Sequence, residues 1–225
     1  MSTFLDSKIH EQWKPFRPEV ELYPILIKNR TKVSPKNVFE LGSHYGSDAE
    51  YLRSAFDIDP KNVFCFEPNP FSFEKLNSNY SQFNNLPLGL SNENTKAEFN
   101  CVMNDDGVSS TRNKIHLVNP DIRKVEVELV RMDYIIDHYN IDTIDICKID
   151  VEGCAYEVLE GFGEHLSKVQ TLQVEAEMMP LFAGQKLFND IYEFLTYNEF
   201  HMVAYFSLGV QCDSVWVKNN LFSVN

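Results

Sequence analysis

The sequence predicts an α/β fold with a mainly parallel sheet, helices on both faces and an antiparallel hairpin near the C-terminal end. From Asn37 onward, short β-rich runs alternate with helical patterns, which is typical of strand-helix-strand units. Two strand-like runs, 201–206 and 213–219, have no helix between them and predict the hairpin. A chain of 225 residues with 44% hydrophobic content is expected to form one core. We therefore predict one domain over 37–225, preceded by a helical or irregular extension over 1–36.

The composition argues against several classes of partner. The net charge is -13, and no cluster of Lys and Arg provides the basic face that nucleic-acid binding requires. No apolar run approaches the roughly 20 residues that cross a bilayer, and residues 1–16 lack the apolar core of a signal peptide. We therefore expect a cytoplasmic protein that binds neither nucleic acid nor membrane. The sequence does not set the oligomeric state.

The cysteine pattern points to reduced thiols. The cysteines are odd in number and none belongs to a C-x-x-C pair, which argues against a disulfide framework and a zinc site. The five are Cys65, Cys101, Cys147, Cys154 and Cys212.

The N-terminal elements have local signals. The extension holds a helical pattern that Pro24 is expected to interrupt. Strand 37–41 leads to a helix from about Ser47, where Ser47 and Glu50 match an S-x-x-E capping box. A second strand follows at 62–67.

The next helix is predicted from its start signals. Pro68 ends the second strand, Asn69 can act as the cap, and Pro70 suits the first helical position. The helix is therefore expected over 69–80, with a third short strand over 85–90.

The middle of the chain, about 91–131, is predicted to be a hairpin or loop insertion. Two alternating segments, 96–102 and 124–130, are separated by about twenty polar residues, a length typical of functional loops. The later elements resume the parallel pattern. They are a strand at 143–150, a short helix at 154–162 that Gly161 ends, a strand at 169–177 and an amphipathic helix at 186–197.

The first strand-to-helix turn favours a cationic ligand over a phosphate. Dinucleotide loops read G-x-G-x-x-G, but here only Gly42 and Gly46 occur. Glu40, Asp48 and Glu50 crowd the position where phosphate charges would have to be held. S-adenosylmethionine, which has a sulfonium, an ammonium and a single carboxylate, suits such a turn.

A second acidic position points to an adenosine group. Glu67 closes the second strand about 20 residues after Gly46, the spacing at which a carboxylate binds ribose hydroxyls. Taken singly, the glycines are explained by a tight turn and Glu67 by a solvated strand end. The combination favours adenosine binding.

The run 144–162, IDICKIDVEGCAYEVLEGF, resembles the FkbM family of S-adenosylmethionine-dependent methyltransferases. The hallmark of that family is a strand ending in K-x-D-x-E-G, followed by a helix and a second glycine. The matching residues are Lys148, Asp150, Glu152, Gly153 and Gly161. The likeness extends in order over about 37–177. It implies a Rossmann-like class I methyltransferase fold with a mainly parallel seven-stranded sheet, and methyl transfer to a hydroxyl oxygen of a small molecule or glycan.

The resemblance also assigns a cofactor site. Glu40, Gly42 and Gly46 are implied to line the methionine end, and Glu67 to hold the ribose. The other residues of the predicted cofactor site are Ser43, His44, Tyr45, Pro68, Leu90, Ser91, Ser109 and Ser110. Two positions depart from the family pattern, with Glu40 where Asp is usual and Met132 where Leu is frequent.

The predicted chemistry needs a base at the carboxyl edge of the sheet. Asp150 is our first candidate, with Glu152 orienting it or the substrate, although both residues are also suited to capping the helix that follows. The substrate site is predicted to include Lys148, Glu175, Glu177 and His116. Lys148 lies in an apolar run and is expected to pair with a carboxylate.

Other chemistries remain alternatives. The prediction contains no resident metal, yet carboxylates at one sheet edge also suit Mg²⁺. His44 and His116 are alternative bases. A nicotinamide-dependent oxidoreductase or epimerase, or a cofactor-binding protein without catalysis, is the competing function.

Overall fold

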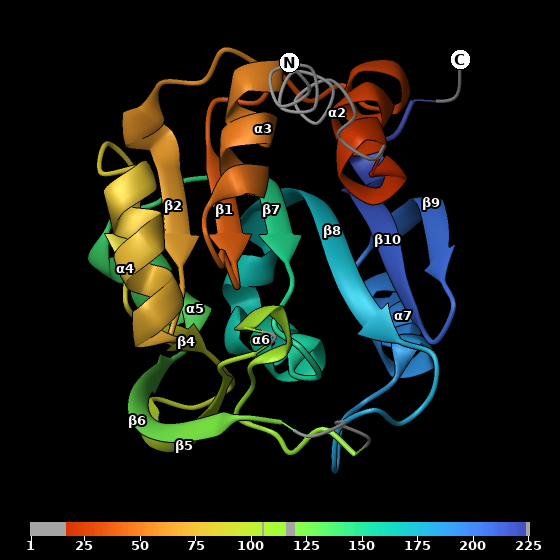
Figure 1. The fold of residues 1–225 in the computed structure, drawn as a ribbon. Coiled ribbons are helices and arrows are strands. Elements are labelled where there is room, and N and C mark those ends of the chain that lie inside the picture. Colours follow the sequence, from red (N-terminus) through yellow and green to blue (C-terminus); the bar gives the residue numbers. More distant parts are fainter. Residues whose placement is uncertain (1–16, 105, 116–119, 224–225) are drawn as a thin grey trace, which may run out of the picture.

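The computed structural model describes residues 17–104, 106–115 and 120–223. It has a seven-stranded sheet in the order β3-β2-β1-β7-β8-β10-β9 and a three-stranded sheet in the order β4-β6-β5 (Figure 1). The strands are β1 (Val38–Leu41), β2 (Val63–Phe66), β3 (Asn84–Leu86), β4 (Gly89–Leu90), β5 (Thr95–Val102), β6 (Ile122–Val130), β7 (Ile144–Ile149), β8 (Val169–Glu177), β9 (Phe200–Leu208) and β10 (Gln211–Lys218).

Helices connect most of these strands. The α-helices are α2 (Pro18–Arg30), α3 (Ser47–Ala55), α4 (Pro70–Asn79), α5 (Met132–His138), α6 (Ala155–Gly161) and α7 (Phe188–Tyr197). Four short 3-10 helices are η1 (Pro60–Asn62), η2 (Asp106–Val108), η3 (Gly163–Lys168) and η4 (Asn219–Leu221). Among the described residues, no helix is long and apolar enough to cross a membrane.

The large sheet confirms the predicted class of fold. The adjacent strands β3, β2, β1, β7 and β8 pair in parallel with one another, and β10 is antiparallel to both β8 and β9. β7 is buried at all six positions, as expected for a central parallel strand covered on both faces. The carboxyl ends of β1, β2, β7 and β8 therefore lie along one edge.

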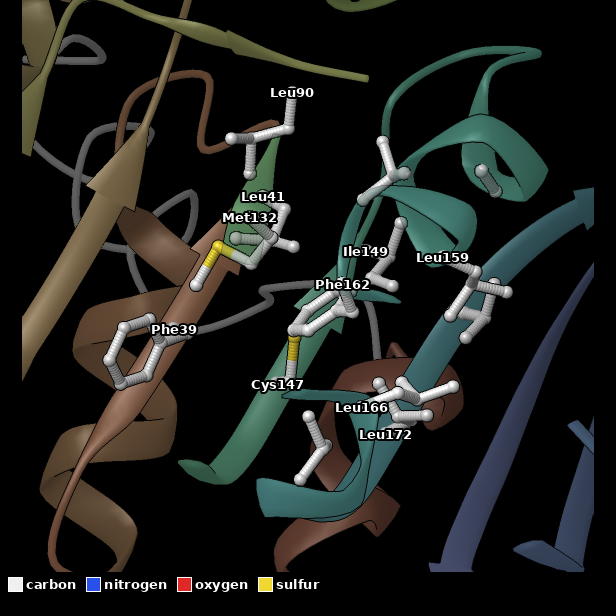
Figure 2. Close-up of a cluster of buried hydrophobic side chains, with 14 of the residues drawn as sticks. Phe39, Leu41, Leu90, Met132, Cys147, Ile149, Leu159, Phe162, Leu166 and Leu172 are labelled. Atoms are coloured by element: carbon white, nitrogen blue, oxygen red, sulfur yellow. The ribbon is translucent and has the colours of Figure 1, made fainter. Parts of the chain in front are cut away.

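Helices cover both faces of the large sheet (Figure 1). On one face, α2, α3 and α4 contribute Tyr23, Leu52 and Leu76 to a buried cluster. On the other face, α5, α6 and α7 contribute to a larger cluster, part of which Figure 2 shows, with Met132 and Phe162 against β1 and β7 and Leu159 against β8. Burial of this apolar area on both faces is the main favourable term in folding.

The N-terminal helix differs from the prediction. α2 runs without interruption through Pro24. Tyr23 is fully buried, and its hydroxyl lies 3.0 Å from Oγ1 of Thr171 on β8. Docking of the helix against the sheet offsets the backbone hydrogen bond that the proline cannot donate. The boundary between an extension and a domain at residue 36 stays a prediction.

The helix caps bear out one prediction and contradict another. Asn69 caps α4, since its side chain accepts a hydrogen bond from the N–H of Phe71. The prediction of a capping box at the start of α3 is wrong. The cap position is Gly46, in a left-handed conformation with φ of 79°, and no side chain among the described residues caps this end of the helix. Glu50 instead pairs with Arg53 at 2.7 Å, one turn further along the helix.

The middle segment forms a sheet of its own. β5 and β6 pair in an antiparallel ladder, which confirms the alternating segments. The short strand predicted over 85–90 is divided, with β3 in the large sheet and β4 parallel to β6 in the small one. The small sheet lies beyond the carboxyl edge of the large sheet (Figure 1), so the two sheets face each other across the ends of β1 and β2.

Candidate active site

A cavity of about 340 Å³ lies at the carboxyl edge of the large sheet. Its walls come from β1, β2, β7 and β8, from the small sheet and from the loop after β5. Open parallel sheets generally bind their ligands at this edge. The predicted residues that line it are Glu40, Gly42, Ser43, His44, Glu67, Pro68, Leu90, Ser91, Ser109, Lys148, Asp150, Glu152 and Glu175.

Four predicted residues lie outside the lining, and one lies outside the described residues. Tyr45 stacks on His44, with ring centroids 3.6 Å apart, and Gly46 packs against α4. The hydroxyl of Ser110 donates to the carbonyl of Glu152 at 2.7 Å, so this serine fixes a loop. Glu177 accepts a hydrogen bond from Gln185 at 3.0 Å. His116 belongs to the residues that the structure does not describe.

The turn after β1 requires glycine at its first position. Gly42 has φ of 86°, and a Cβ there would overlap the carbonyl oxygen of Asp150. The turn therefore packs directly on the end of β7. Ser43 fixes it further, because its hydroxyl donates to the carbonyl of Glu40 at 2.7 Å and accepts from the N–H of Phe66 at 3.0 Å.

Glu67 is held in place by backbone groups. Its carboxylate accepts hydrogen bonds from the N–H of His44 at 2.7 Å and from the N–H of Asn69 at 2.8 Å. One donor follows β1 and the other follows β2, so both loops position the same side chain. A carboxylate fixed in this way can still accept further hydrogen bonds through its remaining lone pairs.

Glu40 is a buried carboxylate that lacks a full set of partners. Its side chain is only 1% exposed and lines the cavity. Its Oε2 atom makes no hydrogen bond with any described residue. Burial raises the pKa of Glu40 well above its ordinary value, although the charge of Lys148 opposes the rise. An orphaned buried oxygen of this kind is costly unless a ligand completes it.

Lys148 links three carboxylates beneath the cavity. It neighbours Glu40 in the β1–β7 register, and its Nζ lies 2.7 Å from Asp150 and 3.3 Å from Asp48. Burial lowers the pKa of Lys148, but the charges of Asp150, Asp48 and Glu40 outweigh burial and raise it well above the ordinary value. The predicted pairing of this lysine with a carboxylate is confirmed.

The pKa values of Asp150 and Glu175 are shifted in opposite directions. Burial raises the pKa of Asp150, but the charge of Lys148 and its hydrogen bond outweigh burial and hold that pKa below its ordinary value. Burial, together with the charge of Asp150, raises the pKa of Glu175 well above its ordinary value. The hydrogen bond between the two carboxyl groups requires one proton, and the opposite directions of the two pKa shifts favour Glu175 as the donor and Asp150 as the acceptor.

Glu152 is turned toward the same pair by an unusual backbone. It has φ of 48°, and the following Gly153 has φ of 83°. The Lys114 ammonium lies 3.7 Å from its carboxylate. Oxygens of Asp150, Glu152 and Glu175 lie within 4.8 Å of one another, a spacing that suits a hard cation. The Lys148 ammonium already provides a positive charge for Asp150.

Several lining residues were not singled out from the sequence. Asp48 was noted only as one acid of the first turn, whereas the structure pairs it with Lys148 and Arg17. Arg17 lies far from the motifs and carries no local signal. The wall near Glu152 also includes Thr111, Arg112, Cys154 and Glu157.

Comparison with known proteins identifies the family. The model of the FkbM methyltransferase domain matches residues 40–202. The chain belongs to the FkbM methyltransferase family. The resemblance seen in the sequence is therefore confirmed, and the matched segment contains the whole motif of Lys148, Asp150 and Glu152 together with the Gly42 turn.

Two characterised relatives are methyltransferases. One is 2-O-methyltransferase NoeI of Sinorhizobium fredii, 28% identical, with the alignment covering 78% of this chain and 76% of the relative. The other is hexuronic acid methyltransferase AglP of Haloferax volcanii, 25% identical, with 76% of this chain and 69% of the relative covered. Both relatives are named for methyl transfer, and neither name supports the alternative of a nicotinamide-dependent oxidoreductase.

Two solved structures support the class I methyltransferase fold. An FkbM methyltransferase from Methylobacillus flagellatus KT superposes with a TM-score of 0.58 at 14% identity, covering 89% of this chain. The chain spans 48% of that protein's length. TrmK of M. capricolum, solved in complex with S-adenosyl-homocysteine, superposes with a TM-score of 0.51 at 10% identity, covering 93% of this chain and 71% of that one.

Proposed function

We propose that this FkbM protein is an S-adenosylmethionine-dependent O-methyltransferase whose acceptor is a hydroxyl group of a glycan or a related small molecule. The observation that carries the proposal is the cavity at the carboxyl edge, where the orphaned oxygen of Glu40 lies beside the Gly42 turn. The names of the two relatives, which specify 2-O-methylation and a hexuronic acid, support an oxygen acceptor on a sugar. The cytoplasmic location expected from the sequence stays a prediction.

The residues present fit this cofactor. One oxygen of Glu40 has no hydrogen-bond partner among the described residues, and an ammonium would supply one. Glu67 offers a fixed acceptor for ribose hydroxyls. Leu90 and Phe99 provide apolar surface in the same cavity, where an adenine ring would pack. When bound, the cofactor supplies a methyl group on a sulfonium that is already activated for in-line displacement.

Asp150 is proposed to receive the proton of the acceptor. It is ionised because Lys148 lowers its pKa, and Glu175 hydrogen-bonds one side of it. The Asp150 carboxylate would accept the proton that the acceptor hydroxyl loses when its oxygen takes the methyl group that the cofactor would supply. Glu152 is proposed to orient the acceptor. Positioning of the reactants is worth roughly 7 to 11 kcal/mol in well-oriented systems, and a base adds about 10² to 10⁴-fold.

The wall beyond Glu152 suits a sugar. It presents the hydroxyl of Thr111, the guanidinium of Arg112 and the carboxylate of Glu157. Arg112 is held by Glu157 at 2.5 Å and by the carbonyl of Ala183 at 3.0 Å. Alternating donors and acceptors match the hydroxyl groups of a glycan better than an apolar acceptor.

Calorimetric titration tests the cofactor. S-adenosylhomocysteine is expected to bind the wild type and to bind the Glu67→Ala variant at least about tenfold more weakly, because hydrogen bonds to a charged group are lost. NAD is expected to bind neither protein. Binding of NAD without any response to S-adenosylhomocysteine would reverse the assignment.

Mass spectrometry tests the acceptor. Oligosaccharides that contain a uronic acid and matched neutral oligosaccharides are incubated with the protein and S-adenosylmethionine. The expected product carries a methyl group on a sugar oxygen. Methylation confined to nitrogen or carbon atoms of other compound classes would contradict the oxygen acceptor and leave the cofactor assignment intact.

A further inference from the structure

The N-terminal segment outside the family-matched region contributes to the same cavity. The match to the family begins at residue 40, whereas Arg17 precedes α2 and lines the cavity beside Glu40 and Asp48. Its guanidinium donates to both oxygens of Asp48, at 2.8 and 3.1 Å. A planar fork of this kind holds a fixed orientation.

The docking of α2 fixes the position of Arg17. Tyr23 is buried against β7 and β8, and Ile27 packs in the same cluster. Lys28 donates to the carbonyl of Ala55 at the end of α3, at 2.9 Å. Since these contacts lie along the helix and away from the cavity, the helix does not depend on Arg17 for its place.

The other cations of the lining are less exposed than Arg17. Among the described residues, the Lys and Arg side chains that line the cavity are Arg17, Arg112 and Lys148. The side chain of Lys148 is 4% exposed between Asp150 and Asp48, and Arg112 is tied to Glu157. The side chain of Arg17 is 47% exposed, so it is the lining cation most open to an incoming ligand.

An amino-acid ligand placed here needs a cation for its carboxylate. The surroundings of the Gly42 turn present the carboxyl groups of Glu40, Asp48 and Asp150, which attract an ammonium but repel a carboxylate. We infer that Arg17 binds the α-carboxylate of the methionine part of the cofactor, while Glu40 takes the ammonium. This inference rests on the proposed function and assigns part of the cofactor site to α2 and its preceding residue.

The experiment compares two cofactors that differ in one group. S-adenosylmethionine and its decarboxylated analogue share the adenosine, the sulfonium and the ammonium, and only the first has the carboxylate. Their affinities are measured by calorimetry for the wild type, Arg17→Gln and Arg17→Lys. Lys28→Gln is the matched control, because it removes one positive charge from the same helix away from the cavity.

The expected result is a selective loss. The wild type and Lys28→Gln are expected to prefer S-adenosylmethionine by about tenfold or more, Arg17→Gln to lose that preference, and Arg17→Lys to retain part of it. An unchanged preference in Arg17→Gln, or an equal loss of affinity for both ligands, would overturn the inference. Failure of the wild type to bind either ligand would instead refute the proposed function.

Discussion

The carboxylates at the ends of β1 and β2 have different surroundings from those at the ends of β7 and β8. Glu67 is held by two backbone N–H groups, and Glu40 keeps one oxygen without a hydrogen-bond partner among the described residues. Asp150 and Glu175, in contrast, are satisfied by Lys148 and by each other. The first pair is arranged to receive a ligand. The second pair already has its charges balanced, which suits it to handling a proton.

Substitution of Asp150 gives the largest expected effect. Asp150→Asn removes the proposed base, so the rate at which a hydroxyl acceptor is methylated is expected to fall by about 10² to 10⁴-fold. Affinity for S-adenosylhomocysteine is expected to stay near the wild-type value, because Glu40 and Glu67, the carboxylates proposed to bind the cofactor, are unchanged. Product formation and calorimetry measure the two quantities. Unchanged turnover would remove Asp150 as the base and direct attention to Glu152.

Removal of the buried ammonium is expected to destabilise the β7 side. Lys148→Met leaves the buried Glu40 and Asp48 and the half-buried Asp150 without their shared cation. Loss of one partner from a buried ion pair typically costs about 3 to 5 kcal/mol, which guanidinium chloride unfolding would show as a lower free energy of unfolding. Lys96→Met, which breaks an exposed pair with Glu126, is the control and should change little. A loss no larger than in the control would contradict the role of Lys148.

Glu40→Gln is expected to weaken binding and strengthen the fold. Affinity for S-adenosylmethionine should fall by about tenfold or more as the ammonium loses its charged partner. Because the folded-state pKa of Glu40 is raised, its unfavourable effect is absent below the unfolded pKa and grows as pH rises toward the folded value. The gain in melting temperature should therefore be small near pH 4 and larger at neutral pH.

The control for Glu40→Gln is Glu50→Gln, an acid of α3 that pairs with Arg53 and does not line the cavity. It should leave cofactor affinity unchanged. A gain in stability from Glu40→Gln that did not depend on pH would show that ionisation of Glu40 is not its cause.

Glu175→Gln is expected to have the smallest effect at neutral pH. The amide donates a hydrogen bond to Asp150 as the protonated carboxyl group does, so turnover should remain well above that of Asp150→Asn. In the wild type, a rise in pH through the raised pKa of Glu175 removes this donor, and turnover should fall. The variant should lack that alkaline decline. A pH profile identical to that of the wild type would separate Glu175 from the chemistry.

Periodicity and the family motif were sufficient to predict the large sheet and the convergence of carboxylates at its edge. β7 was recognisable because its sequence is a largely apolar run, which matches its burial at every position. Lys148 was recognisable because an ammonium in such a run needs a partner. Both properties are local. The partner of Asp48 was not predictable, since Arg17 reaches it across 31 positions of the chain.

Two other errors have different causes, one local and one tertiary. The Ser47 and Glu50 spacing matches a capping box, but Gly46 precedes the helix in a left-handed turn and Arg53 takes the glutamate. Pro24 sits within a continuous helix, which docks through Tyr23. The Tyr23 hydroxyl lies against Thr171 on β8, so no short window of sequence contains both partners of that contact.

The division of the chain between β3 and β4 also has a mechanical consequence. Only Pro87 and Leu88 separate a strand of the large sheet from a strand of the small one, and Leu88, Gly89 and Leu90 line the cavity. Any molecule that touches both Glu67 and Leu90 therefore joins two sheets that share no strand ladder. Its binding free energy also opposes their separation, so occupancy of the cavity and rigidity of the small sheet should rise together.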